Sequence, residues 1–421
     1  MSKREIHVYA DWQEVDGPLL MGRLTSELLR GKEIFSFAYD KDWISRQFAQ
    51  TLDPDLQFYP GPQYLGDDDK LNFGLFLDSS PDRWGRLLMQ RKEAAEARLN
   101  DRQPDKLFET DYLLGVYDGH RMGGLRFKRD PEGPFLSNDA RRATPPWTSI
   151  RELEEISLRL EEEDVINHPK YLEWLSMLMH PGSSLGGARP KASVLDPDNQ
   201  LWIAKFPSNA DNSDVGAWEM VAYELAVAAG INMAKCRART FSSNRHTFLT
   251  RRFDRTHDSK RIHFTSAMTQ LGYTDGADAA TGASYLDIVE FITTHGARVN
   301  ENLEELWRRI VFSICISNTD DHLRNHGFLL SNEGWILSPA FDINPVEHGM
   351  GLKLNISEAD NALDLELAMD VRPYFRVEEN KATKIIDDVK QSVSQWKKVA
   401  SKYSISKTDQ EIKAPAFSVV E

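Results

Sequence analysis

The 421-residue sequence has few cysteines, no long apolar run and fewer basic than acidic residues. Only two cysteines occur, Cys236 and Cys315, which excludes a disulfide framework and fits a reducing compartment such as the cytoplasm. No apolar stretch approaches the roughly 20 residues that span a bilayer, and the first residues, MSKREIHVYADW, lack the apolar segment of a signal peptide. We therefore expect a cytoplasmic protein with no membrane association.

The deficit of positive charge bears on nucleic acids. Lysine and arginine number 51 against 65 aspartates and glutamates, so the formal net charge is −14. A surface this acidic repels a phosphate backbone unless a local basic patch overrides it. We expect any contact with DNA to come mainly through a partner.

The chain divides into two parts joined by a polar segment. Residues 1–130 alternate strand-like runs with turns, and a helix is predicted from the serines before Pro81 to residue 99. Residues 131–147 are rich in Pro, Gly and small polar residues, which is typical of a linker. In 148–421 the patterns predict helices at 149–163, 171–179, 214–231, 284–296, 303–317 and 377–404, strands at 191–195, 201–206, 236–241 and 246–253, and a hairpin at 327–338. Residues 407–421 carry no strong pattern.

The stretch SNTDDHLRNHGF, residues 317–328, has two adjacent aspartates and a nearby asparagine. Protein kinases place a base aspartate and a metal-binding asparagine five residues apart, with a further metal-binding aspartate downstream. Asp320 and Asn325 have this offset, and Asp342 follows 17 residues later in PAFDINP. Asp321 is one residue too close, and we interpret it as a helix cap, a turn former or a partner of His322.

A glycine-containing segment, SSLGGARPKAS, precedes the strand at 191–195. It matches neither the Walker A pattern nor G-x-G-x-x-G. Gly186 and Gly187 nevertheless permit close backbone approach to a phosphate, and Arg189 and Lys191 add positive charge. The segment is compatible with a phosphate-facing loop, although glycines also precede strands without ligands.

Lys205 ends the next strand, LWIAKF, which is the place of the phosphate-binding lysine in protein kinases. A lysine in an apolar strand needs an anion or an exit to water. The following helix offers Glu219 and Glu224; we prefer Glu219, but the sequence leaves both open.

The histidines allow a rival interpretation. His322 and His326 are four residues apart, a metal spacing on a helix, but the glutamate of H-E-x-x-H is absent. We therefore do not expect a zinc hydrolase, and we interpret His322 as a residue that supports the loop of Asp320.

Taken in order, SSLGGARPKASV, LWIAKFPS, FLTRRFDR, SNTDDHLRNHGFLL and LSPAFDINP resemble the HipA family of serine/threonine kinases, over roughly residues 180–345. The stretches SPDRWGRLL and DYLLGVYDGHRMGGLRF are similar to the smaller N-terminal domain of that family. The resemblance implies an α+β fold, in which a small mixed N-terminal domain precedes a two-lobed protein-kinase-like domain with an all-helical C-terminal part. The lobes would be about 148–255 and about 256–421.

The resemblance also implies roles for the singled-out residues. Asp320 matches the catalytic aspartate, Asn325 and Asp342 match the magnesium ligands, and Lys205 matches the lysine on the ATP phosphates. ATP and Mg²⁺ are the implied cofactors.

Further positions match the family less uniformly. Arg251 and Phe253 stand at the contact positions of the adenine-binding hinge, where the family often has an acid in place of Arg251. Arg189 stands where a Gln is frequent. Ser184 matches the serine that the family autophosphorylates, with Ser183 beside it as the open alternative.

Family members are the toxins of bacterial toxin–antitoxin systems linked to persistence. The resemblance implies a HipB-like helix-turn-helix antitoxin as partner and an aminoacyl-tRNA synthetase, such as glutamyl-tRNA synthetase, as substrate. Two other functions stay open: a small-molecule phosphotransferase, which uses a similar Asp and Asn offset, and a catalytically idle corepressor or scaffold in an antitoxin–DNA complex.

Overall fold

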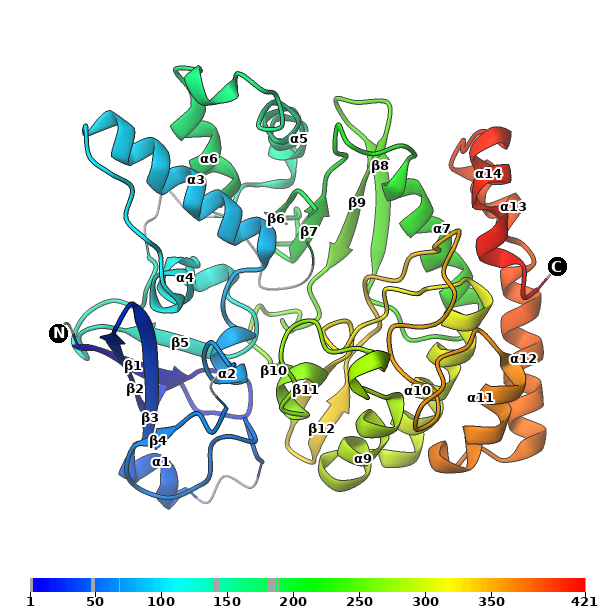
Figure 1. The fold of residues 1–421 in the computed structure, drawn as a ribbon, viewed down its shortest axis with the longest axis horizontal. Helices are drawn as coiled ribbons and strands as arrows, with labels where there is room; N and C mark the ends of the chain where they lie inside the picture. Colours follow the sequence, from blue (N-terminus) through cyan, green and yellow to red (C-terminus); the bar gives the residue numbers. More distant parts are fainter. Residues whose placement is uncertain are drawn as a thin grey trace. The chain divides into compact units, whose positions relative to one another are not determined.

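The computed structural model describes residues 3–46, 50–67, 69–138, 144–179, 187 and 189–420. The chain forms two compact units: the first comprises residues 1–209, 241–243 and 254–265, and the second comprises 210–240, 244–253 and 266–421. Both units mix helices and strands (Figure 1), which confirms the predicted α+β class. The expected N-lobe, about 148–255, contributes to both units, and the domain division at 131–147 stays a prediction.

The first unit begins with an antiparallel sheet. Its strands are β1 (Lys3–Ala10), β2 (Leu19–Leu29), β3 (Lys32–Tyr39), β4 (Gln63–Tyr64) and β5 (Leu125–Lys128), in the order β4-β3-β2-β1-β5. Alternate residues such as Ile6, Val8, Leu24 and Phe37 are buried, as expected for strands with one face on a core.

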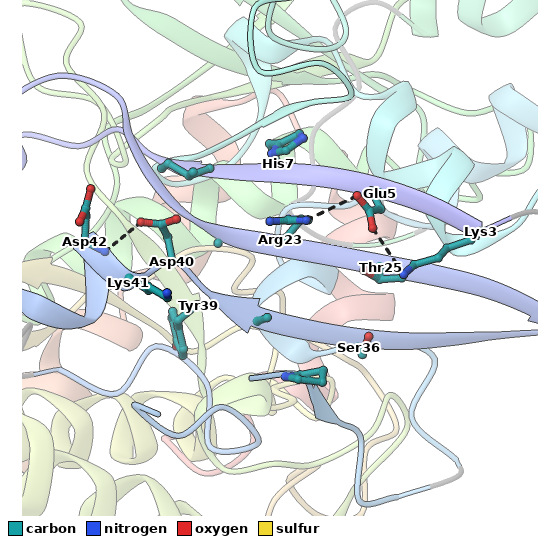
Figure 2. Close-up of a pocket in the computed structure, with 14 residues that line it drawn as sticks. Lys3, Glu5, His7, Arg23, Thr25, Ser36, Tyr39, Asp40, Lys41 and Asp42 are labelled. Atoms are coloured by element: carbon teal, nitrogen blue, oxygen red, sulfur yellow. Dashed lines mark hydrogen bonds and ion pairs between the residues drawn. The ribbon is translucent and has the colours of Figure 1, made fainter. Parts of the chain in front are cut away.

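The opposite face of this sheet is polar and carries a pocket of about 580 Å³ (Figure 2). Glu5 lies between two cations there, 3.4 Å from Lys3 Nζ and 3.7 Å from Arg23 Nη1. These groups are well exposed, so each pair contributes little to stability.

The helices of the first unit are α1 (Lys41–Ser45), α2 (Gly74–Leu77), α3 (Arg83–Leu99), α4 (Glu109–Gly115), α5 (Ile150–Arg159) and α6 (Tyr171–Met179). The start of α3 differs from the prediction. Asp82, not a serine before Pro81, is the N-cap, because its side chain accepts a hydrogen bond from Gly85 N at 2.8 Å. Helix α3 packs against α6.

The strands predicted at 191–195 and 201–206 are β6 (Lys191–Leu195) and β7 (Leu201–Lys205), which pair antiparallel with Lys191 opposite Lys205. Asp196 Oδ1 accepts hydrogen bonds from the backbone of Asp198 and Gln200, and Asn199 adopts a left-handed conformation with φ of 57°. Asp196 and Asn199 thus form the turn that connects the two strands.

The second unit holds α7 (Val215–Ala228), β8 (Cys236–Thr240), β9 (His246–Arg251), α8 (Ala267–Gln270), α9 (Tyr285–His295), α10 (Val299–Cys315), β11 (Gly327–Ser331), β12 (Gly334–Leu337), α11 (Leu365–Val371), α12 (Glu379–Val393), α13 (Trp396–Lys402) and α14 (Lys407–Lys413). Strand β10 (Phe264–Ser266) lies where the chain passes from the first unit to the second. Helix α10 buries Leu303, Leu306, Ile310 and Ile314 at helical spacing and packs against α9 and α12.

Helix α14 was not predicted. Ser406 caps it by accepting a hydrogen bond from Asp409 N at 3.0 Å, and the following turn brings Phe417 onto Trp396, with ring centroids 4.4 Å apart. Among the described residues, no helix is both long enough and apolar enough to traverse a bilayer.

Candidate active site

The loop between α10 and β11 holds the predicted catalytic residues. It begins at Ser317, which adopts a left-handed conformation with φ of 49°, and Asn318 N donates to Ser313 O at 2.8 Å to close the helix. The two adjacent aspartates of the loop differ in their exposure to solvent. Asp320 is exposed, whereas Asp321 is 4% exposed.

Asp320 and Asn325 are joined through the backbone of the loop. Asn325 Nδ2 donates to Asp320 O at 3.1 Å, and His322 N donates to the same carbonyl at 2.9 Å. Asn325 is 5% exposed, and its Oδ1 is a buried acceptor with no hydrogen-bond donor among the described residues. The side-chain amide is therefore held through its nitrogen, and its oxygen can still accept a hydrogen bond or bind a metal ion.

The segment of Asp342 is fastened at both ends. Ala340 N donates to Asn232 O at 2.8 Å, while Asn344 N donates to Asn318 Oδ1 at 3.2 Å and Val346 N to Ser317 O at 3.2 Å. The bonds from Asn344 and Val346 attach the segment to Asn318 and Ser317, shortly before Asp320.

The predicted hinge residues also lie in the second unit. Arg251 N donates to Lys235 O at 2.8 Å. The half-buried Phe253 ring lies 5.4 Å from the Phe341 ring, centroid to centroid. Phe253 is thus brought next to the residue that precedes Asp342.

The two glutamates of α7 differ in their surroundings. Glu224 Oε1 accepts from Lys402 Nζ at 2.6 Å and from the Tyr403 hydroxyl, so the C-terminal helices engage it. Glu219 is 4% exposed. The preference for Glu219 as the partner of Lys205 stays a prediction.

Asp321 contacts Tyr285 and His326, and His322, one of the partners considered for it from the sequence, acts on it through its charge. The Tyr285 hydroxyl donates to Asp321 Oδ2 at 2.6 Å, and His326 Nε2 lies 3.1 Å from Oδ1, outside hydrogen-bond geometry. Burial opposes the charged carboxylate, but His326, Tyr285 and the charge of His322 outweigh it and lower the pKa of Asp321. Burial and the neighbouring carboxylate raise the pKa of Tyr285 well above its usual value.

A metal at this site would have to be held by oxygen ligands. No group of three or more His, Cys, Asp or Glu that could hold a metal ion occurs within the described ranges. Magnesium needs no such group, because one or two carboxylates with substrate phosphates and water complete its shell. The buried Asn325 Oδ1, which has no donor among the described residues, and the Asp342 carboxylate, whose segment is hydrogen-bonded to Ser317 and Asn318, are ligand types that fit such an ion.

The remaining predicted residues belong to the first unit. Lys205 is half-buried at the end of β7, and Gly187 is exposed with φ of 64°. Gly186 and both Ser183 and Ser184 lie outside the described residues. Lys191 does not add free positive charge as expected, because its ammonium is paired with Asp82.

A family model, that of the HipA-like C-terminal domain, matches residues 183–396, about half of the chain. The chain belongs to this family. The match includes all the site residues that the HipA-like chain places in its second unit.

Two curated relatives are named as kinases. The HipA-like chain is 28% identical over 182 residues to a Sinorhizobium fredii protein named "Putative kinase Y4mE" and 25% identical over 179 residues to a Haemophilus influenzae protein named "Putative kinase". Each match covers 38% of this chain, and the matches cover only 41% and 52% of the length of those proteins.

A solved structure extends the likeness to nearly the whole HipA-like chain. HipA of Shewanella oneidensis MR-1, in a toxin–antitoxin complex with HipB and its operator DNA, has a TM-score of 0.65 at 15% identity. The alignment covers 99% of this chain and 95% of that one. It confirms the predicted HipA kinase-like fold.

Sequence reasoning missed Tyr285, which lies 36 residues before its partner Asp321, and Asn318, which anchors the Asp342 segment. It assigned His326 only to a rejected metal pair. A buried carboxylate signals that partners exist, but no spacing in the sequence identifies a tyrosine at the start of another helix.

Proposed function

We propose that this chain is an ATP- and Mg²⁺-dependent protein serine/threonine kinase of the HipA toxin type. The observation that carries the proposal is the joined pair of Asp320 and Asn325: an exposed carboxylate and, five residues later, a buried amide oxygen without a donor among the described residues. Family membership and the kinase names of the relatives support it.

In this mechanism Asp320 orients the hydroxyl of a protein serine or threonine and accepts its proton. The hydroxyl oxygen forms a bond to the γ-phosphorus of ATP as the bond from that phosphorus to the bridging oxygen breaks, and ADP leaves. Asn325 and Asp342 would hold magnesium, which when bound neutralises charge on the phosphates. Lys205, oriented by Glu219, balances the charge that develops on the transferred group.

The other predicted residues take binding roles. Gly186 and Gly187 let the backbone approach the phosphates, and Arg251 and Phe253 contact adenine. Ser184, or Ser183 beside it, would be the site of autophosphorylation. The supporting residues are Asp321 and His322.

The substrate and partner follow from the family. We propose an aminoacyl-tRNA synthetase, such as glutamyl-tRNA synthetase, as the protein substrate and a HipB-like antitoxin as the partner that contacts operator DNA. The HipA structure in complex with HipB and DNA and the net charge of −14 support this division. The proposed location is the cytoplasm.

Incubation of the purified chain with labelled ATP and Mg²⁺ tests the proposal. We expect self-labelling that is lost in Asp320→Ala and retained in Glu224→Gln, a control on α7 outside the proposed site. Labelling of free hydroxyl compounds without labelling of protein would favour the small-molecule phosphotransferase. Calorimetry that detects no Mg²⁺-dependent ATP binding by the wild-type chain would favour the idle scaffold.

A further inference from the structure

The first turn of α3 makes contacts with Lys191 in addition to the hydrogen bond that caps the helix. Asp82 is 2% exposed and uses Oδ1 to cap the helix through Gly85 N. Its second oxygen, Oδ2, lies 2.6 Å from Lys191 Nζ, and Trp84 Nε1 donates to Lys191 O at 3.1 Å. Both the side chain and the main chain of Lys191 are therefore held by this turn, across more than a hundred residues of sequence.

Lys191 connects this turn to the glycine-containing segment. Its side chain is 2% exposed, and its ammonium also donates to the carbonyl oxygen of Gly187 at 3.0 Å. An ammonium buried to this degree needs a carboxylate partner, and Asp82 at 1% side-chain exposure supplies it. With its charge balanced, Lys191 serves as a fixed donor to a backbone carbonyl.

Gly187 is the point at which this donor acts. Its φ of 64° is a conformation that glycine adopts readily and other residues rarely do. A hydrogen bond to the carbonyl oxygen of Gly187 restricts rotation of its backbone and so holds the residue in this conformation. Backbone N–H groups are what a glycine loop offers to a phosphate.

We propose that Asp82 and Lys191 are a positioning pair that sets the backbone of Gly187 for nucleotide binding. In this arrangement the motif SSPDRW of the N-terminal segment acts on Gly187 through one buried ion pair. Lys191 is then distinct in role from Lys205, which faces the phosphates themselves. This inference rests on the proposed function.

The test compares a single and a double substitution. Asp82→Asn keeps the cap acceptor but leaves the Lys191 ammonium buried without its anion, so both the melting temperature and the affinity for Mg²⁺-ATP should fall. Asp82→Asn combined with Lys191→Met removes both charges, so the melting temperature should recover. The affinity should stay lower by roughly tenfold or more, because no donor holds Gly187.

Hydrogen exchange of a peptide spanning 187–195 gives a readout that does not depend on ATP. We expect faster exchange in the double variant despite its recovered stability. The matched control is Asp55→Asn, which breaks the Lys70–Asp55 pair of the same 2.6 Å length elsewhere in the first unit and should leave affinity and exchange unchanged.

A double variant that recovers both stability and affinity, with wild-type exchange, would overturn the proposal. The ion pair would then contribute only to the stability of the fold. If the double variant does not fold, Lys191→Arg decides: it keeps the charge but moves the donors, and unchanged affinity and exchange would again overturn the pair's role. If the double variant exchanges faster but the wild-type chain binds no ATP, the role of the pair in holding Gly187 would stand and the proposed kinase function would be refuted.

Discussion

The two adjacent aspartates should respond oppositely to the same substitution. Asp321→Asn weakens the bond from Tyr285, which as a hydrogen bond to a charged group is worth about 1.5–3 kcal/mol, and it leaves His326 opposite a neutral amide. We expect a loss of about 3 kcal/mol in the free energy of unfolding. Asp320→Asn changes an exposed residue and should stay within about 0.5 kcal/mol of wild type.

Calorimetry measures this difference as a shift in melting temperature. For a second unit of about 200 residues, 3 kcal/mol corresponds to roughly 6–12 °C. Hydrogen exchange of peptides spanning 299–331 assigns the shifted transition to that unit. Self-labelling should show the reverse order, with Asp320→Asn losing about a hundredfold or more and Asp321→Asn losing less.

The pH dependence gives a second check with a defined sign. Because the folded-state pKa of Asp321 is lowered below its ordinary value of 3.8, its stabilisation is present above pH 3.8 and is lost as pH falls through the folded pKa. The difference between wild type and Asp321→Asn should therefore shrink in acid. An Asp321→Asn variant that melts with wild type at pH 7, or an Asp320→Asn variant that melts far below it, would refute the assignment.

Three further outcomes are expected. Asn325→Ala should raise the Mg²⁺ concentration needed for half-maximal ATP binding by roughly tenfold, measured by calorimetry. Burial raises the pKa of Asp53 to about 7, so the stability it contributes is full below pH 3.8 and is lost as pH rises toward 7; urea unfolding of the first unit should show this fall, and Asp53→Asn should flatten it. Glu224→Gln should cost less than about 1 kcal/mol because its partner Lys402 is exposed, whereas Glu219→Gln should weaken ATP binding.

Local signals predicted most elements because local forces determine them. The apolar spacing of α10 and the start of α7 are examples: Asp214, the first residue of the helix predicted at 214–231, caps α7 by accepting a hydrogen bond from Ala217 N at 3.1 Å. Helix α14 was not predicted because its residues lack a strong apolar pattern. It is fastened by Lys413, which pairs with Glu347 and donates to Pro345 O at 3.3 Å.

In the candidate site, too, contacts between residues close in the sequence could be predicted and contacts between distant residues could not. The offset between Asp320 and Asn325 is short enough for one loop to fix, and a hydrogen bond from Asn325 Nδ2 to Asp320 O lies within that loop. The pairs Tyr285–Asp321 and Asp82–Lys191 join residues 36 and 109 positions apart. No periodicity or capping rule relates such residues, so only the folded chain identifies them.

Hydrogen bonds of the main chain explain why the sequence spacing of Asp320, Asn325 and Asp342 could predict the candidate site. Ser317 and Asp342 both adopt left-handed conformations, with φ of 49° and 58°, which cost free energy for residues other than glycine. They persist because hydrogen bonds from Asn344 N to Asn318 Oδ1 and from Val346 N to Ser317 O over-determine the two segments. The main chain therefore sets the positions from which Asp320 and Asp342 present their carboxylates, so a spacing along the sequence becomes a fixed separation in the folded site.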